Sequence, residues 1–137
     1  MGAASERIAA NLRRIRAIRG LTTYQLSERL AAIGHTLRPT GITYIEAGTR
    51  RVDVDDLVAL AAVLNCSPNR LIMPDGLAAC AAGDVKLAGS ITAHPLDAWA
   101  WAIGERPLLT RGGTRATGVD AAVFAIENQP HHHVMQS

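Results

Sequence analysis

The sequence predicts a mainly α-helical protein, because two kinds of pattern agree over its first 73 residues. Apolar residues recur there every three or four positions, which places them on one face of a helix. Glycine, proline and helix-capping residues divide the same region into five short segments. We therefore expect five short helices between residues 5 and 73, joined by compact loops.

The first of these helices is predicted over residues 5–18. Its apolar positions recur at helical spacing, and Gly20 follows where a C-terminal cap belongs. Arginines stand between the apolar positions, so the opposite face should be basic. The side chains expected to be buried are Ile8, Leu12, Ile15 and Ile18.

A second helix is predicted from Thr22 to the neighbourhood of Gly34. Thr22 and Gln25 have the spacing of a capping box, in which each side chain bonds the other residue's backbone amide. Leu21 and Leu26 occupy the matching positions of a hydrophobic staple. These signals agree on where the helix begins.

Three more helices are predicted before residue 75. Pro39 disfavours helical geometry at the residue before it and suits a first helical position, so the third helix should span residues 39–47. Asp53 introduces the fourth helix, with two more acidic residues near its positive end. The fifth falls within residues 67–74. The residues expected to be buried are Ile42, Ile45, Leu57, Leu60, Ala61, Leu64 and Leu71.

Composition limits the class of protein. The 137 residues, 48% of them hydrophobic, suit one compact domain with an appendix. Because the chain has neither a long apolar run nor an apolar N-terminal stretch, we expect a cytoplasmic protein without a membrane span. The two cysteines, Cys66 and Cys80, lack C-x-x-C spacing. We expect them to be reduced and buried, with no disulfide framework and no zinc site.

Charge is distributed unevenly along the chain. Residues 1–73 carry ten arginines against six acidic residues, a net charge of +4, whereas the remainder carries four basic and six acidic residues, a net charge of −2. A basic part joined to a mildly acidic part suits a nucleic-acid binder with a separate interaction segment. An ordinary solvated surface is the alternative explanation of the charge.

The spacing of small, apolar and charged residues extends across all five predicted helices. The residues concerned are Leu12, Ile15, Arg16, Gly20, Leu21, Leu26, Leu30, Gly34, Ile42, Ile45, Glu46, Gly48, Leu57, Leu60, Ala61, Leu64, Leu71 and Ile72. With this pattern, residues 8–72 resemble the Cro/C1-type helix-turn-helix family, also called the XRE family. The resemblance implies a five-helix, lambda-repressor-like DNA-binding domain, which we place at residues 1–75. A small mixed or partly disordered C-terminal segment would follow at residues 76–137.

The resemblance also implies roles for individual residues. Bases would be contacted from the third helix, which such domains present to the major groove. Arg16 would pair with Glu46 inside the protein, and breaking an enclosed pair from one side costs on the order of 3 to 5 kcal/mol. The expected base contacts are Arg38, Pro39, Thr40, Thr43 and Tyr44. The expected phosphate contacts are Thr23, Thr49, Arg50 and Arg51.

Several features depart from the family pattern. Thr23 replaces a usual glutamine and has a shorter reach, and Ser27 replaces a usual alanine. About two extra residues lie between Gly34 and Ile42, so we expect the turn to bulge. The base-contacting surface lacks Asn and Gln, so specificity would come from Arg38 on a guanine, from threonine methyls and from DNA shape. Loss of DNA binding with retention of the scaffold is the alternative.

The sequence after residue 74 is less informative. Residues 84–87 alternate like a strand, and Leu96, Trp99 and Ile103 repeat like the buried face of a short helix that Pro95 opens. Residues 110–118 are rich in Gly, Thr and Arg without the glycine spacing of a nucleotide site, so we expect a mobile connection. The three adjacent histidines fit a solvated tail better than a metal site. They are His131, His132 and His133.

Together these features predict a transcriptional regulator that represses by occupying an operator, with no cofactor and no enzymatic activity, since no catalytic motif occurs. Double-stranded DNA, as a palindromic operator, and a second copy of the chain are the expected partners; a membrane is not. The basic domain shows no surplus apolar surface, so the dimer contact should use Trp99, Trp101, Leu108, Val123 and Phe124. The alternative is an antitoxin-type or adaptor protein that binds a protein partner through the C-terminal segment and uses the helix-turn-helix for autoregulation.

Overall fold

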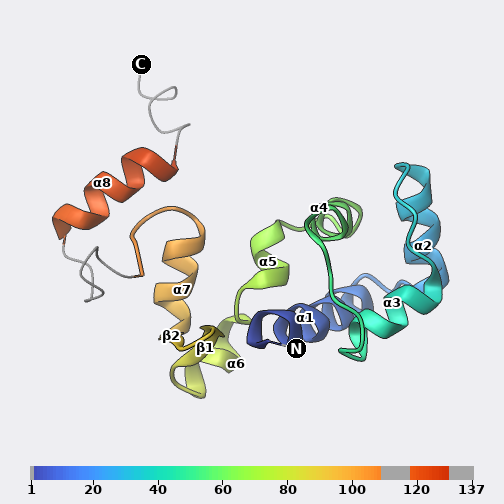
Figure 1. Cartoon of the computed structure of the whole chain (residues 1–137), viewed down its shortest axis with the longest axis horizontal. Helices are drawn as coiled ribbons and strands as arrows, with labels where there is room; N and C mark the ends of the chain where they lie inside the picture. The colour runs from blue at the N-terminus through green and yellow to red at the C-terminus, as the bar shows by residue number, and fades with distance from the viewer. Residues whose placement is uncertain (1, 109–117, 130–137) are drawn as a thin grey trace.

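Helices dominate the computed structural model, which describes residues 2–108 and 118–129 (Figure 1). The five helices predicted in the first half are all present. They are α1 (Ala3–Ile18), α2 (Thr23–Ala32), α3 (Pro39–Glu46), α4 (Val54–Val63) and α5 (Pro68–Ile72).

Local sequence signals set the ends of these helices as predicted. The backbone N–H of Gln25 donates to Thr22 Oγ1 at 3.1 Å, and the backbone N–H of Thr22 donates to Gln25 Oε1 at 2.9 Å, which completes the capping box. Gly20, Gly34 and Gly48 follow α1, α2 and α3 with φ values of 66°, 80° and 76°. Only glycine adopts this conformation without steric cost, so each glycine ends its helix.

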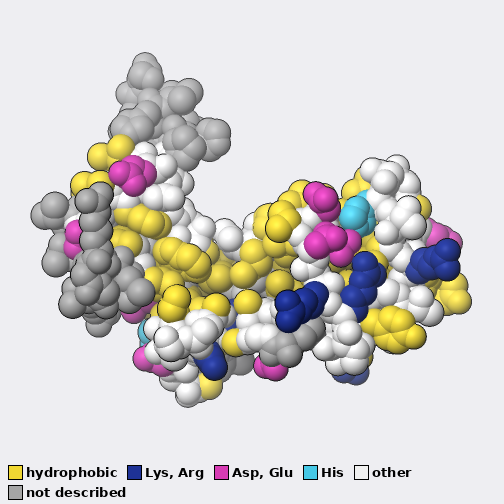
Figure 2. Space-filling view, viewed as in Figure 1, with side chains coloured by type: hydrophobic (Ala, Val, Ile, Leu, Met, Phe, Trp, Pro, Cys, Tyr) yellow, Lys and Arg dark blue, Asp and Glu magenta, His cyan; other side chains and the backbone are white. Residues whose placement is uncertain are grey.

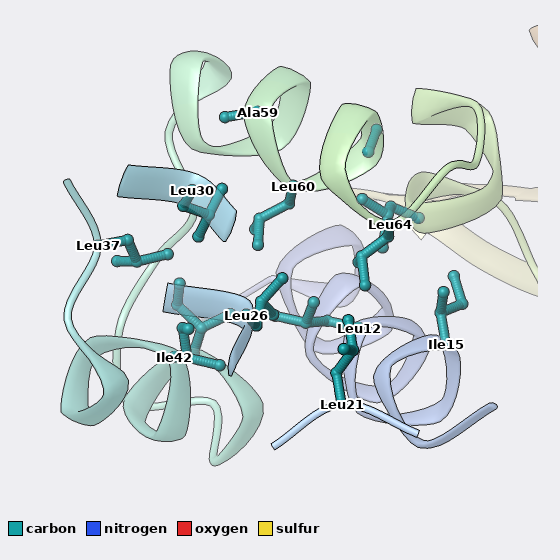
Figure 3. Close-up of a cluster of buried hydrophobic side chains, with 13 residues drawn as sticks. Leu12, Ile15, Leu21, Leu26, Leu30, Leu37, Ile42, Ala59, Leu60 and Leu64 are labelled. Atoms are coloured by element: carbon teal, nitrogen blue, oxygen red, sulfur yellow. The ribbon is translucent and has the colours of Figure 1, made fainter. Parts of the chain in front are cut away.

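The core of this half lies where α1, α2, α3, α4 and α5 converge (Figure 3). Each helix contributes its periodic apolar face, which removes these side chains from water and provides the main driving force for folding. The buried cluster consists of Leu12, Ile15, Leu21, Leu26, Leu30, Leu37, Ile42, Ile45, Ala59, Leu60, Ala61, Leu64 and Leu71.

Four predictions of burial in this part of the chain were wrong, the first of them at Ile8, which is half-buried. Ile18 is 63% exposed, because a repeat of three residues drifts by about 60° per step around a helix with 3.6 residues per turn. Leu57 is half-buried at the edge of the core, and Cys66 is half-buried as well. The expectation that the basic domain has no surplus apolar surface also fails, since large apolar side chains remain outside the single core. The aliphatic ones exposed by more than half are Ile18, Ile33, Val54 and Val58, and Tyr24 and Tyr44 are exposed to a similar extent.

The C-terminal part adds α6 (Gly76–Ala81), β1 (Val85–Ala88), β2 (Ile91–Ala93), α7 (Pro95–Ala102) and α8 (Gly118–Asn128). β1 and β2 form a two-stranded antiparallel sheet. The predicted strand and the helix opened by Pro95 are present, whereas α6, β2 and α8 were not predicted. Cys80, in α6, is half-buried and free. Residues 110–117 of the predicted mobile connection lie outside the described residues, and so do His131, His132 and His133.

Of the three residues predicted on the buried face of α7, only Trp99 packs inward. Leu96 is 63% exposed and Ile103 is 47% exposed, while Ala98 is fully buried. Trp99 decides this orientation, because its indole N–H donates to the Pro74 carbonyl at 2.8 Å. With the tryptophan fixed there, the small alanines of α7 face the second cluster. That cluster is built on Met73, Leu87 and Ala98.

Helix α1 connects the two parts of the chain. Asn11 is buried, and its amide donates to the carbonyls of Leu71 and Met73, both at 2.9 Å. Arg7 donates to the carbonyl of Ile72 at 3.1 Å and also to that of Lys86 in β1. Burial lowers the pKa of the Arg7 guanidinium. Main-chain carbonyls on both sides of residue 75 are therefore satisfied by side chains of α1.

Candidate nucleic-acid interface

The exposed face of α3 carries the side chains expected to meet DNA bases. Ile42 and Ile45 on the opposite face are buried in the core, so the orientation of α3 is determined by packing. Pro39, the first residue of the helix, is half-buried. The exposed side chains at the predicted positions are Arg38, Thr40, Thr43 and Tyr44.

The long turn between α2 and α3 is held to the core by three contacts. Leu37 is buried within the core cluster. Its carbonyl accepts a hydrogen bond of 2.7 Å from the Ser27 hydroxyl. Ser27 stands where the family usually has an alanine, and its hydroxyl stabilises the longer turn. His35 Nε2 lies 2.7 Å from Asp56 Oδ1 at the start of α4. The extra residues therefore form an ordered segment packed against α2 and α4.

The predicted contact between Arg16 and Glu46 is present in the structure. Arg16 Nε lies 2.6 Å from Glu46 Oε1, and Arg16 Nη2 lies 2.9 Å from Oε2, so the pair is bidentate. Hydrogen bonding to Glu46 raises the pKa of Arg16. Arg16 also donates to the Leu21 carbonyl at 2.8 Å. The guanidinium thus joins α1, the loop before α2 and the C-terminal end of α3.

The loop after α3 holds three of the four predicted phosphate contacts, and each of the three has a different environment. The Thr49 hydroxyl donates to the Tyr44 carbonyl at 3.1 Å, which uses the one donor that a hydroxyl has. Arg50 lies 3.6 Å from Asp56 Oδ2. Arg51 is exposed and makes no hydrogen bond or ion pair with the described residues. Arg51 is therefore available to a phosphate as it stands, whereas Thr49 and Arg50 would first exchange internal partners.

Two residues near this loop were not assigned a role by the sequence. A Cβ atom on Gly41 would lie 2.5 Å from Arg50 Nη1, so the absence of a side chain leaves room for that guanidinium. The available signal was a glycine inside a short helix, where it costs about 1 kcal/mol relative to alanine. Asp56 is a buried carboxylate that contacts both His35 and Arg50. Its position in the first turn of α4 suggested only a helix-dipole effect.

The arginines differ in how far their charge is available. Several are committed to internal partners, as Arg7 is to carbonyls and Arg14 is to Asp75 at 2.9 Å. On the face shown in Figure 2, most Lys and Arg side chains lie over the part of the molecule built by α1–α5. The side chains of four arginines of this part make no hydrogen bond or ion pair with the described residues, namely those of Arg13, Arg29, Arg38 and Arg51.

Comparison with known proteins identifies the class of this module. Residues 12–71 match the family model described as helix-turn-helix, which covers α2, the turn and α3 together with the supporting helices. This segment matches the model of XRE-type helix-turn-helix domains, the DNA-binding modules of a family of transcription regulators. The match over residues 12–71 supports a DNA-binding transcription regulator.

Three solved structures are similar to part of this chain. The restriction-modification controller protein C.AhdI from Aeromonas hydrophila is 25% identical over 50% of this chain and 97% of its own, with a TM-score of 0.45. The DNA-binding domain of BldD is 25% identical over 53% of this chain and 97% of its own, with a TM-score of 0.45. The hypothetical transcription factor NHTF from Neisseria is 20% identical over 52% of this chain and 76% of its own, with a TM-score of 0.46. No curated protein matches the chain.

Within residues 2–108 and 118–129, no group of three or more His, Cys, Asp or Glu side chains is arranged to hold a metal ion. None of the helices in these ranges has the length and apolarity needed to cross a bilayer.

Proposed function

We propose that this protein is a sequence-specific repressor that acts by occupying its operator. The observation that carries the proposal is the exposed polar face of α3, which the Arg16–Glu46 pair holds against α1. Free arginines stand at both ends of this face, with Arg38 before α3 and Arg51 after it. A cation near each end of an inserted helix suits a major groove bordered by two phosphate backbones.

Base discrimination on this face is assigned to a few side chains. Arg38 would donate to the O6 and N7 atoms of a guanine, the contact that arginine makes best. Thr43 donates its hydroxyl to the Pro39 carbonyl at 3.1 Å, so its methyl group is what it offers to a thymine. Thr40 would offer a second methyl group, and Tyr44 and Pro39 would add apolar contact along the groove. DNA shape would supply part of the selectivity.

Phosphate binding is assigned to Thr23, Thr49, Arg50 and Arg51. Arg51 would act without rearrangement. Arg50 would leave a contact of 3.6 Å with Asp56, which is long for an ion pair and therefore weak. Thr49 would exchange its bond to the Tyr44 carbonyl for a bond to a phosphate oxygen. These contacts fix the register of the protein on the duplex and carry no sequence information themselves.

We infer that the protein binds a palindromic operator as a homodimer. One helix reading a few base pairs gives too little discrimination for a genomic site, because each good base contact contributes about 1 to 3 kcal/mol. Trp99 and Leu108 pack into the second cluster of their own chain, and Phe124 is half-buried. Trp101 and Val123 remain exposed by 39% and 53%, so the dimer contact is assigned to them.

The test begins with the DNA sites that the protein occupies. Genomic footprinting of the full chain should yield a two-fold symmetric site, and transcription from a promoter containing that site should fall when the protein is added. Arg38→Ala should then weaken binding to this site by about 1 to 3 kcal/mol and relax the preference at one base pair. Arg29→Ala, which removes an equally free cation from the last turn of α2, is the matched control.

A second variant separates phosphate contacts from base contacts. Arg51→Ala should weaken binding to all sequences alike and lower the slope of log affinity against log salt by about one. An affinity that does not depend on salt would refute the proposal. A stoichiometric protein partner recovered with the full chain, together with DNA binding restricted to its own promoter, would favour the antitoxin-type or adaptor alternative.

A further inference from the structure

A small recess beside the base-contacting face of α3 contains an unused cation. The recess has a volume of about 330 Å³ and opens between α1, α2 and α3. We propose that it binds a DNA backbone phosphate through Arg13 of α1 and Thr23 of α2, so that α1 takes part in DNA binding directly. The inference rests on the proposed function and adds a contact from α1, a helix that holds none of the DNA contacts predicted from the sequence. The lining residues are Arg13, Arg16, Thr23, Thr43, Glu46 and Ala47.

The position of the recess suits a phosphate that flanks the bases read by α3. Thr43, one of the predicted base contacts, forms part of its wall, so the recess adjoins the surface that would face the groove. Thr23, a predicted phosphate contact, forms another part of the wall. Since a water molecule takes up about 30 Å³ of liquid, the recess has room for a phosphate group and several waters.

The charges in the recess favour an anion. Glu46 is already neutralised by the bidentate contact with Arg16, at 2.6 and 2.9 Å. The lining side chains therefore carry a net charge of +1, and Arg13 supplies it. A phosphodiester carries one negative charge and would balance this excess.

A neighbouring groove shows that exposure of Arg13 is not sufficient by itself. This wider groove, of about 580 Å³, lies along α1 and is also lined by Arg13 and Arg14. It contains Glu6 and Glu46 as well, so its formal charges cancel, and Arg14 is bound to Asp75 at 2.9 Å. The guanidinium of Arg13 stands between the two openings, and only the smaller one has a positive balance.

The donors required for a phosphate are free in the recess. The Arg13 side chain makes no hydrogen bond or ion pair with the described residues, so the five N–H donors of its guanidinium are unused. The Thr23 hydroxyl also has no partner among them. The planar guanidinium can bind two phosphate oxygens at once, which a lysine cannot reproduce. Thr43 shapes the recess without donating, because its hydroxyl is bound to the Pro39 carbonyl.

Binding of the full chain to a fluorescent duplex of mixed sequence tests this assignment, since a phosphate contact does not depend on sequence. Arg13→Ala should lower the slope of log affinity against log salt by about 0.9. If the variant and the wild type bind equally at 1 M salt, the variant should then bind about eightfold more weakly than the wild type at about 0.1 M salt. Arg13→Lys should restore part of the loss. Thr23→Val should give a smaller loss with the same melting temperature.

Arg29→Ala is the matched control, because it removes the same charge from a free arginine that does not line the recess. We expect its salt slope to equal that of the wild type. Equal salt slopes for Arg13→Ala and the wild type, or an equal decrease for Arg13→Ala and Arg29→Ala, would overturn the inference while leaving the proposed function intact. A wild-type chain that binds no duplex at all would overturn the proposed function, and the inference with it.

Discussion

Replacing Glu46 by alanine should destabilise the whole helix-turn-helix domain. The side chains of Arg16 and Glu46 are 20% and 10% exposed, and they make two short charge-assisted bonds. After the substitution Arg16 keeps only its bond to the Leu21 carbonyl, and the two nitrogens that donate to Glu46 lose their acceptor. Removing one partner of a buried pair costs about 3 to 5 kcal/mol, and partial access to water places this case at about 3 kcal/mol.

Thermal and urea unfolding measured by circular dichroism would check this value. For a domain of this size a loss of about 3 kcal/mol corresponds to a melting temperature lower by about 12 to 24 °C. Glu28→Ala is the matched control, because it removes the same charge from an exposed glutamate of α2 that has no partner among the described residues. Glu46→Gln should lie between Glu46→Ala and the wild type, since the amide oxygen can still accept from Arg16.

A double-mutant cycle with Arg16→Met would assign the loss to the pair. The double variant should be less destabilised than the sum of the single variants, because it leaves no unpaired charge in the interface. If Glu46→Ala and Glu28→Ala had the same unfolding midpoint, Arg16 would not be holding α3 against α1, and the orientation argued for α3 would lose its physical cause.

Three further predictions concern Gly41, assembly and a cysteine. Gly41→Ala should stabilise the protein by up to about 1 kcal/mol in an Arg50→Ala background. The gain should be smaller in the wild type, where the new Cβ lies 2.5 Å from Arg50 Nη1; equal effects in urea unfolding would contradict the contact. Trp101→Asp should raise the dimer dissociation constant measured by sedimentation, and a loss of dimer with Val54→Asp instead would move the interface to α4. Burial raises the pKa of the Cys66 thiol, so the folded protein keeps a proton that the unfolded chain releases above its ordinary pKa of 9.0. Its contribution to stability is complete below that pH and is lost as the pH rises, and alkylation at pH 8 should be slower in the folded protein than in urea; equal rates would show that the thiol is not shielded.

The sequence by itself determined the five helices of the first half and the identity of the module. The capping box of Thr22 and Gln25, proline at the start of α3, and glycine after α1, α2 and α3 all act within about five residues of chain. Such signals keep their meaning whatever surrounds them, because they satisfy or remove the free backbone groups at helix ends. The contact between Arg16 and Glu46 was available only through resemblance, since nothing local connects residues 30 positions apart.

Tertiary structure alone decided how these helices present their side chains. The contact of His35 with Asp56 and the placement of Arg50 over Gly41 join separate elements, and no periodicity in the sequence encodes them. The same holds for α7, in which the hydrogen bond from Trp99 to the Pro74 carbonyl fixes an orientation that leaves Leu96 and Ile103 exposed. Short elements such as β2 span too few residues to show a pattern, so their formation depends on a partner that only the fold brings within reach.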